Sequence, residues 1–124
     1  MTRILVVDDD ADIGRLVAEV LGDEGHQVRP LTRPQELAAA ITSWQPDLVL
    51  LDVNLPYFDV WAALPLKSAP AALPLPVILM TGDRNAFNAV ADLGALGVTG
   101  HLFKPFELTE LLASVECACR LQSV

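Results

Sequence analysis

The stretch ILVVDDD, residues 4–10, joins four apolar side chains directly to three consecutive carboxylates. An apolar run of this kind is typical of a strand that is buried on both faces. Asp8, Asp9 and Asp10 follow at the end of the strand, where like charges repel one another unless a cation neutralises them. The stretch therefore predicts an opening strand that carries an acidic site at its carboxyl end.

The same change from apolar to polar residues recurs along the chain. DLVLLDV (47–53) and PVILMTG (76–82) are continuous apolar runs typical of central parallel strands, and HLF (101–103) makes a short last strand. QVRPL (27–31) alternates apolar and polar residues but contains a proline, which cannot donate to a strand ladder. We therefore expect five strands, with residues 27–31 at an edge of the sheet.

Helical periodicity occupies the segments between the strands. A first helix that ends near Gly22 or Gly25 and a last helix that begins at Glu107 each have one apolar face: Ile13, Leu16, Val17, Val20 and Leu21 in the first, and Leu108, Leu111, Leu112, Val115 and Cys119 in the last. Pro34 suits the first turn of a second helix, which buries Leu37, Ile41 and Trp44. Prolines limit a third helix to about residues 59–66, and the Ala- and Gly-rich stretch 85–97 predicts a weak fourth.

Alternating strands and helices with right-handed crossovers predict a parallel α/β sheet with helices on both faces. Ligands in such folds gather outside the carboxyl ends of the strands. The residues at those ends are Asp8 and Asp9 on the first strand, Asp52 on the third, Thr81 on the fourth and Lys104 on the fifth. All of them are therefore expected to face one crevice.

The composition excludes several classes of protein. The 124 residues fit one domain, 52% are hydrophobic, and no apolar run approaches the roughly 20 residues of a membrane helix. A formal charge of -8 would repel phosphate backbones and anionic membranes, so neither nucleic acid nor a membrane is expected as a direct partner. Cys117 and Cys119, two residues apart on a predicted helix, are interpreted as structural. The start, MTRILVV, lacks signal-peptide features, so a cytoplasmic location is expected.

The strand-end residues have compatible chemistry. Each alone has a simpler interpretation, such as Asp10 capping the first helix or Asp8 and Asp9 forming a solvated turn. Together they offer only hard oxygen ligands, which select Mg²⁺ or Mn²⁺ and leave coordination positions for water and a phosphate oxygen. The ammonium of Lys104 and the hydroxyl of Thr81 would then face a phosphoryl group on Asp52.

The sequence resembles the receiver domain of two-component response regulators over essentially its whole length. ILVVDDD is similar to the opening strand and acidic pair of that family, and LVLLDVNLP (48–56) to its phosphoacceptor strand and loop. ILMTG (78–82) is similar to its switch-threonine strand, and HLFKPF (101–106) to its lysine-proline strand end. The resemblance implies a flavodoxin-like doubly wound sheet, order 2-1-3-4-5, as a single receiver domain over residues 1–124 without an output domain.

The resemblance implies a role for each site residue. Asp52 would accept a phosphoryl group from a sensor histidine kinase or a histidine phosphotransfer protein, and Lys104 and Thr81 would bind phosphoryl oxygens. Mg²⁺ would be held by Asp9 and Asp52, by Asp8 largely through water, and by the backbone carbonyl of Asn54. Such a domain catalyses only its own phosphorylation and dephosphorylation, and in this family the bond before Pro105 is usually cis.

The resemblance also implies a role for the residues two positions after Asp52 and two positions after Thr81. From these positions, here Asn54 and Asp83, family members steer the water that hydrolyses the acyl phosphate. Gly82, the small residue after Thr81, would leave the acyl phosphate open to its donor.

Two positions depart from the family pattern. Val60 stands where the family generally has Gly, so a positive φ there is disfavoured and the loop is expected to be remodelled. His101 stands where the family usually has a switch Tyr or Phe. We expect His101 and Thr81 to form the switch, which would act on a surface of residues 85–121 that is also a candidate homodimer face.

Three alternatives remain open. A haloacid-dehalogenase-like phosphohydrolase would share the Asp, Thr, Lys and Mg²⁺, but it generally needs a second Asp where this chain has Asn54. A flavin- or nucleotide-binding module would need a Gly- or hydroxyl-rich first turn instead of Asp8 to Asp10. A degenerate receiver would act only as a binding module.

Overall fold

The computed structural model describes residues 2–67, 74–88 and 92–122. Its centre is a five-stranded sheet in which every neighbouring pair is parallel, with the order β2-β1-β3-β4-β5. The strands are β1 (Arg3–Val7), β2 (Gln27–Leu31), β3 (Leu48–Asp52), β4 (Val77–Thr81) and β5 (Val98–Phe103). The predicted fold class and strand order are confirmed, and β2 with its proline lies at an edge.

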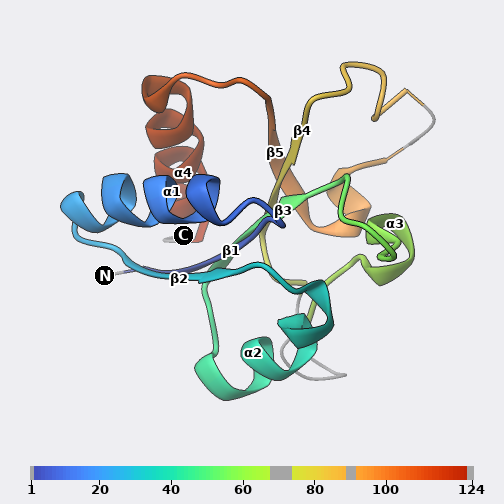
Figure 1. The fold of residues 1–124 in the computed structure, drawn as a ribbon, viewed down its shortest axis with the longest axis horizontal. Coiled ribbons are helices and arrows are strands. Elements are labelled where there is room, and N and C mark those ends of the chain that lie inside the picture. The colour runs from blue at the N-terminus through green and yellow to red at the C-terminus, as the bar shows by residue number, and fades with distance from the viewer. Residues whose placement is uncertain (1, 68–73, 89–91, 123–124) are drawn as a thin grey trace.

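Helices cover both faces of this sheet. Helices α1 (Ala11–Asp23) and α4 (Leu108–Gln122) lie on one side, and α2 (Leu37–Trp44) and α3 (Val60–Ala63) lie on the other (Figure 1). The core is accordingly divided in two: Leu5 and Val7 of β1 pack toward α2 and α3, whereas Ile4 and Val6 pack toward α1 and α4. The central strands β3 and β4 are buried along their whole length, as continuous apolar runs predict.

The first helix follows its sequence pattern with one exception. The Asp10 side chain caps it by accepting a hydrogen bond from the Asp12 N–H at 2.9 Å. Val17 and Leu21 are fully buried, but Leu16, which was expected on the buried face, is 48% exposed. Leu108, at the start of α4, is likewise 43% exposed because it precedes the part of the helix that packs on the sheet. These two burial predictions are wrong.

The second helix begins later than expected. Pro34 starts a short 3-10 turn, η1 (Pro34–Glu36), which leads directly into α2. Leu37 and Ile41 are buried and Trp44 packs partly buried against the same cluster, in agreement with the predicted face.

The third helix is shorter than predicted. Its N-cap is Asp59, whose side chain accepts from the Ala62 N–H, and it ends at Ala63. Leu64 is extended because it precedes Pro65, and the helical region is disfavoured for a residue that precedes a proline. Val60 is the first residue of this helix, and the positive φ in the loop falls on Tyr57 instead. Val60 itself does not adopt a positive φ, in agreement with the expectation that a residue other than glycine disfavours it, whereas remodelling of the loop stays a prediction.

The predicted fourth helix over residues 85–97 is wrong for the part of that stretch that the structure describes. Turns occupy residues 84–88, and a 3-10 turn, η2 (Gly94–Leu96), precedes β5, while residues 89–91 lie outside the described residues. Local bonds compete with a helix here, because Asp83 accepts from the Asn85 N–H and Asp92 from the Ala95 N–H. Gly97 then takes a left-handed φ of 79° that ends the turn.

In the described part of the chain, the helices are too short or too polar to span a bilayer.

Candidate functional site

The sheet register brings the expected strand ends together. Val7 pairs with Leu51 and Asp52 pairs with Met80, so the residues that end β1, β3 and β4 lie at one edge of the sheet. Thr81 pairs with Phe103, which places Lys104 just beyond the end of β5 beside them. Asp8, Asp52 and Thr81 are the buried polar residues of the described chain, and all three belong to this edge.

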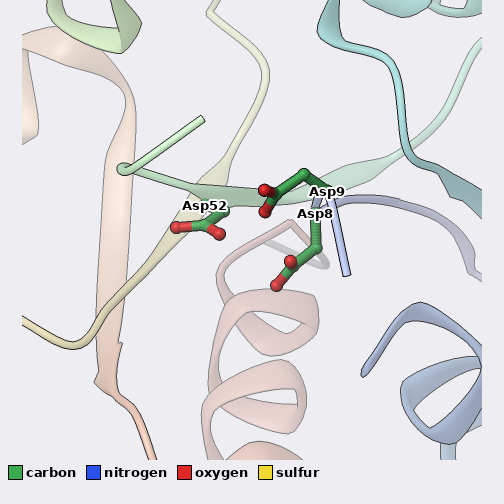
Figure 2. A group of neighbouring side chains, drawn as sticks. All are labelled: Asp8, Asp9 and Asp52. Carbon is green, nitrogen blue, oxygen red and sulfur yellow. The ribbon is translucent and has the colours of Figure 1, made fainter. Parts of the chain in front are cut away.

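Three carboxylates converge at the centre of this edge. One oxygen from each of Asp8, Asp9 and Asp52 lies within 4.8 Å of the others. Asp8 and Asp9 extend from the end of β1, and Asp52 lies next to them at the end of β3 (Figure 2). The donor set fits a hard divalent cation such as Mg²⁺, because all three are charged oxygen ligands and the exposed Asp9 leaves an approach from solvent.

Lys104 neutralises part of this charge. Its Nζ donates to Asp8 Oδ2 at 2.6 Å and to Asp52 Oδ2 at 3.0 Å. The Lys104 side chain is 22% exposed, whereas both carboxylates are almost entirely buried. A single ammonium therefore bridges the end of β1 and the end of β3, as a fixed counter-ion in a crowded acidic site. The Lys104–Pro105 peptide is cis, as the resemblance implied.

The pKa values of this pair reflect burial and the ion pairs. Burial raises the pKa of Asp8 above 3.8, and the hydrogen bonds from Lys104 and from the Asp10 N–H offset the rise only in part. Burial alone would lower the pKa of Lys104, but hydrogen bonds and charges from Asp8 and Asp52 outweigh it, so the pKa lies above 10.5. Lys104 is thus held as a cation, whereas burial destabilises the charged form of Asp8.

Thr81 is held by groups from two loops. Its Oγ1 accepts a hydrogen bond from the Asp83 N–H at 3.0 Å and another from Asn54 Nδ2 at 3.1 Å. The Asn54 N–H in turn donates to Asp52 Oδ1 at 3.0 Å. The Asp83 carboxylate accepts from the Asn85 N–H, so this side chain is engaged within its own turn. Of the two residues expected to tune lifetime, only Asn54 contacts Thr81 through its side chain.

His101 lies in an aromatic cluster that the sequence did not reveal. Its ring centroid is 4.9 Å from that of Phe87 and 5.2 Å from that of Phe103. Phe87 also packs edge-on against Trp61, and the Arg84 guanidinium lies 4.9 Å above the Phe103 ring. His101 is exposed and pairs with Leu79, whereas Phe103 pairs with Thr81. Because residue order alone does not reveal strand register, Phe103 and Phe87 were missed.

The surroundings of the acidic site are open on one side and apolar on another. A Cβ at Gly82, the residue after Thr81, would meet nothing within 4 Å, so the space beside this glycine is open. On the α1 side, a groove of about 340 Å³ is lined by Ile13, Leu16, Val17, Lys104, Pro105 and Phe106. Lys104 therefore both lines the groove and forms hydrogen bonds in the acidic site.

Comparison with known proteins identifies the family. The profile of the response regulator receiver domain matches residues 4–116. The transcriptional regulatory protein PcoR of Escherichia coli is 34% identical over 120 residues, which cover 97% of this chain and 52% of PcoR. The DNA-binding response regulator MtrA of Mycolicibacterium paratuberculosis is 33% identical, with 95% of this chain and 51% of MtrA covered. The chain thus spans about half the length of these relatives.

Solved structures agree with the sequence relatives. The chemotaxis response regulator CheY4 of Vibrio cholerae matches with a TM-score of 0.80 and 26% identity, over 95% of this chain and 98% of CheY4. NtrX of Brucella abortus matches with a TM-score of 0.82 and 36% identity, over 98% of this chain and 28% of NtrX. The DNA binding in the name of MtrA runs partly against the expectation that nucleic acid is not a partner. The chain belongs to the response regulator receiver domain family, whose members serve in two-component signalling.

Proposed function

We propose that this receiver domain accepts a phosphoryl group on Asp52 from a phosphohistidine of a sensor kinase or phosphotransfer protein. The observation that carries the proposal is the bridge from Lys104 Nζ to Asp52 Oδ2 and Asp8 Oδ2, next to the buried hydroxyl of Thr81. A carboxylate that faces an ammonium, a hydroxyl and two further carboxylates is equipped to carry a phosphoryl group with its cation.

Asp52, Lys104 and Thr81 would each have a different role in the phosphoryl transfer. A carboxylate oxygen of Asp52 forms the new bond to phosphorus while the bond from phosphorus to the donor imidazole nitrogen breaks, and the imidazole leaves with that electron pair. Lys104, already directed at Oδ2, would hold one phosphoryl oxygen, and Thr81 would donate its hydroxyl to another. Mg²⁺, when bound, would neutralise charge on the phosphoryl oxygens.

The acidic cluster would hold the metal. Asp9 and Asp52 would supply direct carboxylate ligands, Asp8 would act largely through water, and the Asn54 carbonyl would complete the set. Titration of Mg²⁺ into Asp9→Asn should show much weaker binding than the native protein, because one of three converging charges is lost. Affinity equal to that of the native protein would place the metal elsewhere.

The apolar groove beside Lys104 supports a helical phosphodonor as the partner. Leu16, a large exposed apolar side chain, lines this groove together with Lys104. Lys104 in turn donates a hydrogen bond to Asp52. A protein that delivers phosphohistidine to Asp52 has to cover the surface around it, and an apolar helix face matches this lining. With such a donor as its partner, the domain is proposed to act in the cytoplasm.

The output is proposed to pass through Thr81 and His101 to the surface of residues 85–121, where a phosphorylated homodimer could form. The charge of -8 disfavours contact between this domain and nucleic acid, so any such contact would fall to regions like those that PcoR and MtrA have beyond the matched part. The single domain of residues 1–124 would then serve as the phosphorylation-controlled unit.

The test is an intact-mass measurement after incubation with Mg²⁺ and acetyl phosphate. The native protein should gain one phosphoryl group, and Asp52→Asn should gain none. A degenerate receiver would gain none in either form. A phosphohydrolase would release phosphate continuously from varied monoesters, which the amide of Asn54 disfavours because it cannot exchange protons as a general acid.

A further inference from the structure

Asn54 connects the proposed phosphoacceptor to the buried threonine by two separate groups. Its backbone N–H donates to Asp52 Oδ1 at 3.0 Å, and its side-chain Nδ2 donates to Thr81 Oγ1 at 3.1 Å. Asn54 itself is exposed, whereas Thr81 is fully buried. The contact between an exposed amide and a buried hydroxyl can therefore be removed without opening the core.

The hydroxyl of Thr81 has no spare acceptor capacity. A threonine hydroxyl offers two lone pairs and one proton, and N–H groups of Asp83 and Asn54 occupy both lone pairs. Within residues 2–67, 74–88 and 92–122, no hydrogen bond joins this hydroxyl to Asp52. The hydroxyl is thus held by N–H groups from two loops.

The Asp52 carboxylate has two distinct sides. Oδ1 accepts the Asn54 N–H, whereas Oδ2 faces Lys104. A phosphoryl group bound through Oδ2 would leave the bond between the Asn54 backbone and Oδ1 in place. Asn54 would then stay fixed while Thr81 moves toward the phosphoryl group, and the bond from Nδ2 to Oγ1 would have to lengthen.

We propose that the Asn54 side-chain amide is a positioning residue that restrains Thr81 in its resting place and so limits the switch. This inference rests on the phosphoryl transfer proposed above, but it assigns Asn54 a role distinct from steering the hydrolytic water. A neutral hydrogen bond of ordinary net strength shifts a two-state population by about two- to tenfold. Removal of the amide donor should therefore favour the shifted position of Thr81 by that factor.

The first measurement uses the resting protein without any ligand. Thr81 is observed through its methyl group by NMR in the native protein, in Asn54→Leu, which has similar size but no donor, and in Asn85→Leu. Asn85 is an exposed asparagine that forms hydrogen bonds with Asp83 and Asn88, so it is a matched control. Asn54→Leu should move or broaden the Thr81 methyl signal, and Asn85→Leu should not. An unchanged Thr81 signal in Asn54→Leu would overturn the proposal.

The second measurement uses beryllium fluoride with Mg²⁺ as a phosphoryl analogue that is not hydrolysed, so lifetime effects do not enter. Its apparent dissociation constant should fall about two- to tenfold in Asn54→Leu relative to the native protein. In a Thr81→Val background, which lacks the acceptor, Asn54→Leu should cause no further change. Unchanged or weaker binding in Asn54→Leu, or an equal gain without the Thr81 hydroxyl, would overturn the proposal.

The two measurements separate the two claims. If beryllium fluoride saturates none of the variants while the Thr81 signal responds to Asn54→Leu, the proposed phosphoacceptor function fails and the restraint on Thr81 stands. If the analogue binds normally and neither readout responds to Asn54→Leu, the restraint fails and the phosphoacceptor function stands.

Discussion

Replacement of Lys104 by Met tests how the acidic site is kept stable without a metal. The substitution keeps most of the apolar stem but removes the ammonium that bonds to Asp8 and Asp52 at 2.6 and 3.0 Å. Loss of one partner from a buried ion pair costs about 3–5 kcal/mol, because the remaining charge is left uncompensated. Because the Lys104 side chain is 22% exposed and water can enter, we expect a loss of about 2–4 kcal/mol.

The assay is urea denaturation of the native protein, Lys104→Met and the control Lys67→Met, in chelator and in Mg²⁺. Lys67 is exposed, so its replacement should be nearly neutral. In chelator, the free energy of unfolding of Lys104→Met should be about 2–4 kcal/mol below that of the native protein, and the urea midpoint should fall accordingly. Saturating Mg²⁺ should recover much of the loss, because a bound cation stabilises the folded state by mass action.

The pH dependence has a defined sign. The pKa of Asp8 is already raised by burial, and removal of Lys104 would take away hydrogen-bond and charge contributions that lower it. A group whose pKa is raised on folding stabilises the protein below its unfolded pKa, and that contribution is lost as the pH rises. The deficit of Lys104→Met should therefore shrink as the pH falls toward the acid range. Native-like stability in chelator at pH 7 would refute the role of Lys104 as an internal counter-ion.

Four further outcomes are expected. Asp8→Asn should be more stable than native in chelator at pH 7, with the gain shrinking toward pH 4 as native Asp8 takes up its proton; urea titrations at both pH values check this. Asn54→Leu and Asp83→Leu should each lengthen the lifetime of the phosphorylated protein, followed by phosphate release; native decay rates would exclude them from water positioning. His101→Ala should still be phosphorylated but lose most phosphorylation-dependent self-association, seen by light scattering; an unchanged response would make His101 a surface residue. Leu16→Glu should slow transfer from the cognate kinase but not from acetyl phosphate, and equal slowing of both would argue against docking in the groove.

The sheet and the acidic edge could be predicted because they depend on short-range patterns. Continuous apolar runs specify central strands, Pro30 marks an edge, and polar residues at strand ends identify the site. Parallel topology then brings those ends together whatever the details of the loops, so Asp8, Asp52 and Lys104 could be placed in one crevice from sequence.

The helix over residues 85–97 could not be excluded in the same way. Its apolar periodicity suited a weak helix, but side-chain bonds from Asp83 and Asp92 to nearby N–H groups favour turns in the described part of this stretch. The exposure of Leu16 and Leu108 could not be predicted from the sequence pattern either. Periodicity shows which side chains share a helix face, but it does not show how much of that face other elements cover.

The contacts of Asn54 and His101 depend on geometry between segments that are distant in sequence. The hydrogen bond from the Asn54 amide to Thr81 joins a loop to the end of a strand 27 residues further along the chain, and no spacing rule specifies it. The cluster of His101, Phe87 and Phe103 follows from the register of β4 and β5, which shifts between Val77 and Ile78. A one-residue shift decides which side chain lies opposite Thr81, so only the structure could show that it is Phe103.

The most direct test of the central claim is to locate the phosphoryl group. Protein treated with acetyl phosphate and Mg²⁺ is reduced with borohydride, which converts an aspartyl phosphate to homoserine, and the peptides are then analysed by mass spectrometry. Homoserine is expected at position 52 alone, dependent on Mg²⁺ and strongly reduced in Lys104→Met. Homoserine at Asp8 or Asp9, or at no position in a protein that binds Mg²⁺ and is fully folded, would contradict the assignment of Asp52 as phosphoacceptor.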